Sequence, residues 1–255
     1  MSPSDTTDPF AKGMVAWSQE DEKVLENYRL WQVGLISPYL GSRTIEVGAG
    51  NGIFAQAVLD GRSFERYIAL EPSDHFFEGL KDIARETSGG VEVQQATIDE
   101  VVRDGSLLGT FDSVFSVHVL EHIEDDLNFV RKAFQLIRPG GHFVALVPAL
   151  DFLYSPLDKT IGHFRRYEKA KMSRLAESAG VEVVMNRYDN LIGILGWLWV
   201  CKIRKVDYQS NENKRKLKGY FSFFSNYILP FASRIEKVVP PPIGLNLSCV
   251  LRKPA

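Results

Sequence analysis

Short apolar runs alternate with amphipathic segments along the chain from residue 43 onward. Five runs rich in Val, Ile and Phe have the length of buried strands, at residues 43–47, 66–70, 91–95, 111–117 and 141–147. Helical patterns fall between them at about 51–60, 74–86 and 124–137. Strand and helix repeated in this way predict an α/β fold, in which a doubly wound, mostly parallel sheet has right-handed crossovers and helices on both faces.

The flanking segments extend this pattern at both ends. Residues 20–40 place Leu25, Tyr28 and Trp31 at helical spacing, which predicts a helix that packs over the sheet. After the fifth strand we expect a helix at about 169–179 that ends at Gly180, and two further strands at 181–188 and near 245–252, seven in all. We therefore expect a disordered leader at 1–19 and one domain at 20–255, with insertions at about 148–168 and 189–239.

Composition narrows the class of protein. The 255 residues are 45% hydrophobic and 24% charged, as in a soluble globular protein, and a formal net charge of −2 argues against a protein that coats nucleic acid. The two cysteines, Cys201 and Cys249, form no C-x-x-C pair, so the sequence indicates neither a disulfide framework nor a zinc site. The polar N-terminus lacks a secretory signal, which predicts a cytoplasmic protein.

A glycine-rich turn follows the first predicted strand in TIEVGAGNGIF, residues 44–54. A dinucleotide-binding turn needs a third glycine where this chain has Ile53. The spacing is instead G-x-G-x-G, and Glu46, just before it, would repel a phosphate but attract an ammonium group. The turn therefore predicts a ligand without a pyrophosphate, although such turns are also found with a purely structural role.

A second acidic residue, Glu71, closes the second strand in IALEPS, where a carboxylate can accept hydrogen bonds from both ribose hydroxyls. With this residue the sequence resembles the class I S-adenosylmethionine-dependent methyltransferases, which share an acidic G-x-G-x-G motif and an acid at the end of the second strand. FDSVFSVHVLEHIEDD (111–126) and LIRPGGHFVALVPA (136–149) are similar to later segments of that family. YSPLDKTIGHFRRY and a PPP-x-G-L segment resemble an uncharacterised bacterial subgroup.

The resemblance implies S-adenosyl-L-methionine as cofactor in a Rossmann-like fold. It also implies a set of cofactor-binding residues, in which Thr97 and Ile98 replace part of the usual third-strand motif: Glu46, Gly48, Ala49, Gly50, Gly52, Glu71, Pro72, Thr97, Ile98, Val117 and His118.

Methyl transfer from a sulfonium is an in-line displacement that depends on alignment and exclusion of water, so we expect no metal. An oxygen nucleophile must lose its proton, and histidine is the usual base. We expect His163, in GHFRRY, to be that base, with His122 as the second candidate and Tyr154, Arg166 and Tyr167 beside the acceptor. A structural alternative is that GHFRRY only caps the following helix, that His122 caps a helix beside Glu121, and that His118 is a wall of the pocket.

Adjacent arginines cannot both point the same way on regular structure. We therefore expect at most one of Arg165 and Arg166 to fork onto an acceptor carboxylate or phosphate, while the other pairs with an acid. Burial of Arg166 against Glu121 or Asp151 is the alternative.

The insertion at 189–239 carries WLWV, a basic cluster between Lys202 and Lys218, and GYFSFFSNYILPF. Its longest apolar run, 191–201, has 11 residues, whereas a membrane-spanning helix needs about 20. Aromatic residues beside basic ones predict either a lid over the pocket or peripheral membrane contact through 191–230.

We expect O-methylation of a small-molecule, glycan or lipid-linked acceptor. Two alternatives are a cofactor-binding protein without methyl transfer, which includes one that catalyses a rearrangement, and an RNA methyltransferase. Only the basic cluster favours the latter.

Overall fold

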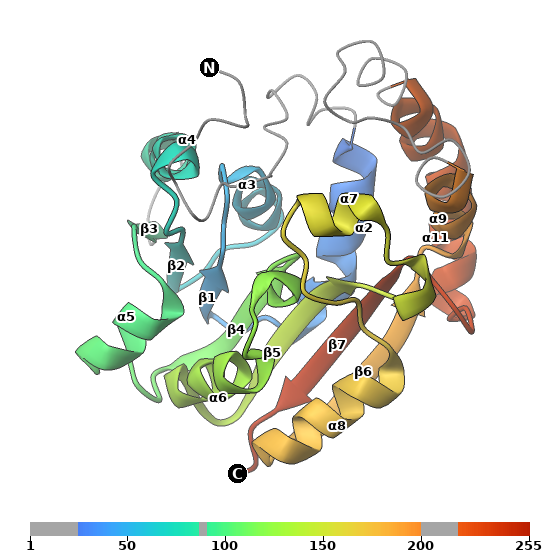
Figure 1. Ribbon diagram of the computed structural model, residues 1–255. Coiled ribbons are helices and arrows are strands. Elements are labelled where there is room, and N and C mark those ends of the chain that lie inside the picture. The colour runs from blue at the N-terminus through green and yellow to red at the C-terminus, as the bar shows by residue number, and fades with distance from the viewer. Residues whose placement is uncertain (1–24, 87–90, 200–218) are drawn as a thin grey trace.

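The computed structural model describes residues 25–86, 91–199 and 219–255, and a seven-stranded sheet forms its centre (Figure 1). The strand order is β3-β2-β1-β4-β5-β7-β6. The first five strands pair in parallel, and β7 lies antiparallel between β5 and β6. The predicted fold class, a doubly wound and mostly parallel sheet of seven strands, is therefore confirmed.

Every apolar run that predicted a strand forms one. The strands are β1 Arg43–Val47, β2 Arg66–Leu70, β3 Val91–Gln94, β4 Phe111–Val117, β5 Ile137–Pro148, β6 Glu182–Asp189 and β7 Asn246–Arg252. The clearest difference lies in β5, which begins four residues before the predicted start at 141. Ile137 pairs with Phe111 across an irregularity in the register, so the turn residues that follow Ile137 are part of the strand.

The described helices lie between and beside these strands. They are α2 Glu26–Ile36, α3 Ile53–Asp60, α4 Asp74–Glu86, α5 Ile98–Asp104, α6 Asp126–Leu136, α7 Pro156–Thr160, α8 Lys169–Ala179, α9 Leu191–Trp197 and α11 Leu229–Val238. Short helical turns are η2 Ser37–Tyr39, η3 Leu120–His122, η4 Asp151–Leu153 and the π-helical η6 Phe224–Ile228. As predicted, α8 ends at Gly180, which adopts a φ of +73°.

The segment 148–168, where an insertion was expected, contains η4 and α7. Ser155 and Asp158 make a reciprocal capping box at the start of α7, in which the Asp158 carboxylate accepts from the Ser155 backbone N–H at 2.9 Å. Pro156 occupies the first helical position, where its missing N–H costs nothing. These local contacts explain why so short a helix forms.

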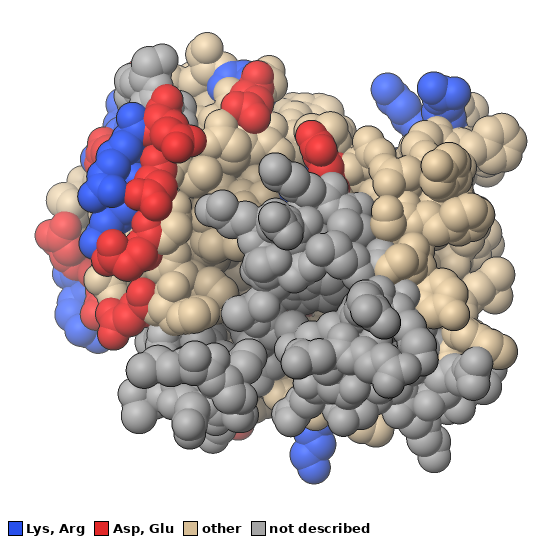
Figure 2. Space-filling model, turned by 90° about the horizontal axis from the view of Figure 1, so that it is seen from above, with Lys and Arg blue, Asp and Glu red and all other residues tan. Residues whose placement is uncertain are grey.

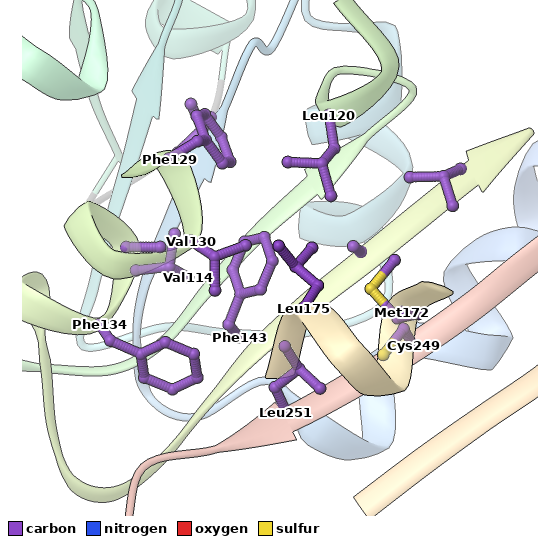
Figure 3. Close-up of a cluster of buried hydrophobic side chains, with 14 of the residues drawn as sticks. Val114, Leu120, Phe129, Val130, Phe134, Phe143, Met172, Leu175, Cys249 and Leu251 are labelled. Carbon is purple, nitrogen blue, oxygen red and sulfur yellow. The ribbon is translucent and has the colours of Figure 1, made fainter. Parts of the chain in front are cut away.

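Two apolar layers hold the helices to the sheet. Figure 3 shows one layer, in which Val114 and Phe143 of the sheet meet Phe129 of α6 and Leu175 of α8. The second layer joins α2, α3 and α4 to the opposite face of the sheet, with Ile36 among its fully buried side chains. Burial on both faces explains why the central strands read as continuous apolar runs.

The outer surface differs from side to side. Seen from above, the side of α4 carries rows of basic and acidic residues, whereas the side of α9 and α11 is mostly uncharged (Figure 2). None of the described helices is long and apolar enough to cross a membrane. The expected leader at 1–19 and the basic cluster at 202–218 lie outside the described residues.

Candidate active site

The glycine turn between β1 and α3 forms one wall of a cavity of about 880 Å³. Gly48, Gly50 and Gly52 all adopt positive φ values, +73°, +58° and +82°, which strain any residue with a side chain. A Cβ on Gly48 would also lie 2.5 Å from Val119, whereas one on Gly50 would meet nothing within 4 Å. The backbone N–H groups of Gly48 and Ala49 both donate to the Leu70 carbonyl, which ties the turn to the end of β2.

Glu71, at the end of β2, lies directly against this turn. Its carboxylate accepts the Gly50 N–H at 2.7 Å and the Ser73 N–H at 2.9 Å. Glu71 is buried and borders the cavity. A carboxylate can accept about four hydrogen bonds, so these contacts are compatible with further ones from a ligand.

Glu46 is the second carboxylate of this wall. It is buried and accepts a hydrogen bond from the Tyr67 hydroxyl. Burial raises the pKa of Glu46 to about 7, an effect that the Tyr67 hydrogen bond reduces and the nearby Glu71 carboxylate reinforces. A cationic ligand in the cavity would compensate the charge of this carboxylate, and a pyrophosphate would not.

The other residues implied for the cofactor come from the ends of neighbouring strands. Thr97 is the N-cap of α5 and takes part in a capping box with Glu100, so its hydroxyl supports the helix beside the cavity. Of the cofactor-binding residues expected from the sequence, all but Gly52 border the cavity: Glu46, Gly48, Ala49, Gly50, Glu71, Pro72, Thr97, Ile98, Val117 and His118. Gly52 instead packs against Leu80 and Ile83 of α4, where a Cβ would lie 2.7 Å from Ile83.

The cavity also has a wall that sequence reasoning missed. Helix α2 and the residue before it contribute Leu25, Tyr28, Arg29 and Gln32 to it. The Gln32 side-chain nitrogen lies 3.2 Å from Nε2 of His118. The helical spacing of Leu25 and Tyr28 signalled the helix itself, but nothing in the spacing shows that the helix reaches the carboxyl ends of β1 and β4.

A second wall of the cavity includes residues that follow β4, where three histidines surround Glu121; we call His118, His122, His163 and Glu121 the histidine cluster. His118 Nδ1 lies 3.4 Å and His163 Nε2 3.8 Å from Oε1 of Glu121, and the rings of His122 and His163 are 4.7 Å apart. Burial alone would raise the pKa of Glu121. The three histidines, of which His118 has the largest effect, hold that pKa below its usual range. Burial lowers the pKa of His122, and the Glu121 charge offsets only part of this.

Within this cluster only His118 and His122 border the cavity. His163, the expected base, does not border the cavity; its Nδ1 is 2.9 Å from Oδ1 of Asp158, and its ring lies beside that of His122. Its neighbours Ile161, Gly162 and Phe164 do border the cavity. A base role for His163 stays a prediction, and its geometry is that of a group acting through His122.

The two arginines of GHFRRY do not lie as expected. Arg166 is only 1% exposed and forks onto Asp158, with Nε and Nη2 donating at 2.9 and 3.2 Å, so its partner is neither Glu121 nor Asp151. Arg165 pairs with Asp126 at 2.7 Å. Both arginines therefore pair with acids and neither borders the cavity, so contact of Arg166 with an acceptor stays a prediction.

The two tyrosines of this region also bond within the protein. The Tyr154 hydroxyl donates to the His163 carbonyl at 2.7 Å. Tyr167 is buried, and its hydroxyl donates to the Leu120 carbonyl at 3.2 Å and to Asp126 at 3.0 Å. Neither borders the cavity, and a position of either tyrosine beside the acceptor stays a prediction.

Residues 45–145 match a family model described as a methyltransferase domain. A curated relative, the ubiquinone biosynthesis O-methyltransferase of Methylobacterium sp. (strain 4-46), is 32% identical over 108 residues, which are 42% of this chain and 41% of that protein. The chain thus spans about two fifths of that relative's length.

Two solved structures share the fold. One is an S-adenosylmethionine-dependent methyltransferase from Mesorhizobium loti, with a TM-score of 0.54, 14% identity and coverage of 87% of this chain and 96% of that one. The other is the cyclase SpnF, with a TM-score of 0.58, 15% identity and coverage of 95% and 85%.

Proposed function

We propose that this chain, in which residues 45–145 form a methyltransferase domain with S-adenosyl-L-methionine as cofactor, methylates an oxygen atom of a small-molecule acceptor. When bound, the cofactor supplies an activated methyl group on a positively charged sulfur. The proposal depends mainly on one observation: the glycine turn with its two carboxylates borders the same cavity as His118 and His122 of the histidine cluster.

The wall at β1 and β2 has the groups that a cationic nucleoside needs. Glu71 is placed to accept hydrogen bonds from ribose hydroxyls, and Gly50 leaves open space at a position where a Cβ would meet no atom within 4 Å. The buried Glu46 carboxylate favours a positive charge nearby because burial disfavours its ionised form. Thr97 and Ile98, at the start of α5, border the region that would receive the base.

The second wall has what an oxygen acceptor needs. The acceptor hydroxyl must lose its proton as the methyl group arrives, and imidazoles are suited to that step near neutral pH. His118 and His122 are within reach of a molecule in the cavity, and His163 supports them from behind. The apolar neighbours Val119, Ile123 and Phe164 would exclude water around a planar or apolar acceptor.

Turnover with labelled cofactor tests this function. The full chain is incubated with the cofactor carrying an isotopically labelled methyl group and with a small-molecule extract, and products are identified by mass spectrometry. We expect a labelled methyl ether whose formation requires Glu71. A labelled amine or carbon product would contradict O-methylation, and cofactor binding without any labelled product would contradict methyl transfer.

The described part of the insertion favours a lipid-linked acceptor. Tyr227, Phe231, Ile235 and Val238 recur at helical spacing on η6 and α11 and are between 52% and 80% exposed. Exposed apolar side chains of this size on one helical face are typical of interfacial contact. We therefore propose that this face settles on a membrane surface, where the cavity can receive an acceptor with a lipid tail.

Binding to liposomes tests the membrane proposal. Vesicles with anionic lipid should retain the protein at low salt and release it at high salt, because salt screens the attraction of basic residues. Phe231→Ser should weaken retention, whereas Phe152→Ser, at an exposed phenylalanine outside this face, should not. Equal retention of the two variants, or none by the wild type, would show that the face has another role.

A further inference from the structure

The Glu121 side chain has an unusual position for a carboxylate. It is completely buried, and among the residues that the structure describes neither of its oxygens has a hydrogen-bond partner. The ring nitrogens nearest to it, of His118 at 3.4 Å and of His163 at 3.8 Å, are beyond the 2.7–2.9 Å of a charge-assisted hydrogen bond. Buried carboxylates are normally paired or bound to metals, because an uncompensated charge in the interior is costly.

One imidazole is oriented toward this carboxylate by a contact on its far side, and a second lies nearby. His163 uses Nδ1 for Asp158, which leaves Nε2 directed at Glu121. His122 has a hydrogen bond to the Gly162 backbone. One ligand-type atom from each of Glu121, His122 and His163 lies within 4.8 Å of the others. Three of the five histidines of the chain therefore gather around one carboxylate when His118 is included.

We propose that Glu121, His122 and His163 bind a single divalent transition-metal cation of the zinc type. One carboxylate and two imidazoles are a ligand set that such cations favour, and three protein ligands leave a position open. The cation would compensate the Glu121 charge at the oxygens that have no hydrogen-bond partner. This goes against the expectation from the sequence that no metal is needed.

The surroundings of His163 have the form of a supporting shell for a metal ligand. A metal-bound histidine commonly donates its second ring N–H to a carboxylate, which fixes the ring and its tautomer. Asp158 is that carboxylate here, and it is held in turn by Arg166 at 2.9 Å and by the Ser155 hydroxyl at 2.9 Å. Asp158 and Arg166 are both buried, so the orientation of His163 is rigidly defined.

The cavity offers both access and a use for this cation. His122 and Gly162 border the cavity, so an ion can enter from it, and the open position would face the acceptor. The role of the cation rests on the proposed function, in which it would hold the acceptor oxygen beside the methyl donor. Its binding to the protein requires neither cofactor nor acceptor.

Metal content and affinity test the site. The full chain is stripped with a chelator and titrated with Zn²⁺ by calorimetry, and with Co²⁺, whose visible absorption reports ligand type and geometry. We expect one ion per chain and a rise in melting temperature with Zn²⁺. Asp158→Asn should weaken Zn²⁺ affinity about 10- to 100-fold, as loss of an outer-shell partner does.

Glu121→Gln and His122→Ala should weaken binding further, and His75→Ala, at an exposed histidine on α4, should bind as the wild type does. Each variant is first shown to be folded by its thermal transition and by its affinity for S-adenosylmethionine. Failure of the folded wild type to bind Zn²⁺, or unaltered binding by the folded Glu121→Gln and His122→Ala variants, would overturn the proposal.

The two proposals can fail separately. Methyl transfer by a chain that contains no metal and is unaffected by chelator would contradict the metal site and leave the proposed function intact. Stoichiometric Zn²⁺ binding by a chain with no affinity for S-adenosylmethionine would leave the metal site and contradict the proposed function.

Discussion

The two walls of the cavity are built in different ways. The wall at β1 and β2 depends on backbone: three glycines with positive φ, N–H groups directed at Leu70, and carboxylates that lie next to the last residue of a strand. The second wall depends on side chains from two segments, 118–122 and 154–166, which meet only in the folded protein. Backbone geometry requires particular residues at fixed spacing in the sequence. A side-chain network can instead be built from residues at many different separations in the sequence.

Substitutions should therefore separate the two walls by what they change. In the first wall we expect effects on cofactor affinity and on stability. In the second wall we expect effects on the rate of methyl transfer, with cofactor affinity nearly unchanged. Four substitutions test this division.

His163→Ala should lower the rate of methyl transfer about 10²- to 10⁴-fold, the range typical for loss of a group that manages a proton. His163 does not border the cavity but contacts His122, whose ring is 4.7 Å away, so its loss disorders the second wall only. Single-turnover kinetics measure the rate, and calorimetry should show cofactor affinity within about twofold of wild type. Near-normal turnover would make His163 purely structural; His75→Ala is the control.

Glu46→Gln should stabilise the protein at alkaline pH. The folded-state pKa of Glu46 is raised from 4.5 to about 7. Between these two pH values, Glu46 keeps its proton in the folded protein but has lost it in the unfolded chain. The free energy of unfolding of the wild type therefore falls as pH rises through this window, by about 3 kcal/mol in full.

A glutamine at this position has no such penalty, so the difference between variant and wild type should be near zero at about pH 4 and largest above about pH 7. Urea denaturation at both ends of this range measures it. The same variant should bind the cationic cofactor more weakly, since the charge that destabilises the free protein is the one that the ligand compensates. A stability difference independent of pH would contradict this account.

Glu71→Ala should weaken cofactor binding about tenfold or more, a loss of about 1.4 kcal/mol, through the missing hydrogen bonds to the ligand and to the Gly50 N–H. Calorimetry measures the affinity. Glu65→Ala, at a carboxylate outside the cavity, is the control. Unchanged affinity would exclude Glu71 as a ribose ligand, and measurable binding of NAD would contradict the interpretation of the turn.

Tyr154→Phe should have the smallest effect. It removes the hydrogen bond from the Tyr154 hydroxyl to the His163 carbonyl, worth about 1 kcal/mol of stability. Chemical denaturation measures this loss, and the rate of methyl transfer should fall by less than about tenfold. A loss as large as that of His163→Ala would mean that the Tyr154 hydroxyl itself meets the acceptor, as the sequence pattern predicts.

These contrasts also explain what could be predicted from the sequence. The strands were predictable because buried parallel strands are continuous apolar runs, and the glycine turn because positive φ leaves few choices of residue. The partner of Arg166 was not predictable, since acidic residues at several distances along the sequence could reach this side chain. Asp158 became the partner only because the capping box forms α7 and directs this carboxylate inward.

The start of β5 and the wall formed by α2 show a second limit. Ile137 joins the strand through pairing with Phe111, a contact between residues 26 positions apart that no local pattern reveals. Helix α2 was predictable as a helix, but the closeness of Gln32 to His118 depends on how the helix packs over the sheet. Local pattern determined the elements; long-range packing determined which of their side chains meet.

The position of β7 has a consequence for synthesis on the ribosome. It lies between β5 and β6 in the sheet but follows both in the chain. It forms seven residue pairs with each of them, and the pairing with β6 has one irregularity in its register. Until β7 is synthesised, β6 has no partner strand in the described sheet. The edge of β5 that faces away from β4 is unpaired during the same period. The domain can therefore complete its sheet only after residue 252 has left the exit tunnel, and until then the unpaired edge of β5 is a target for chaperones or for aggregation.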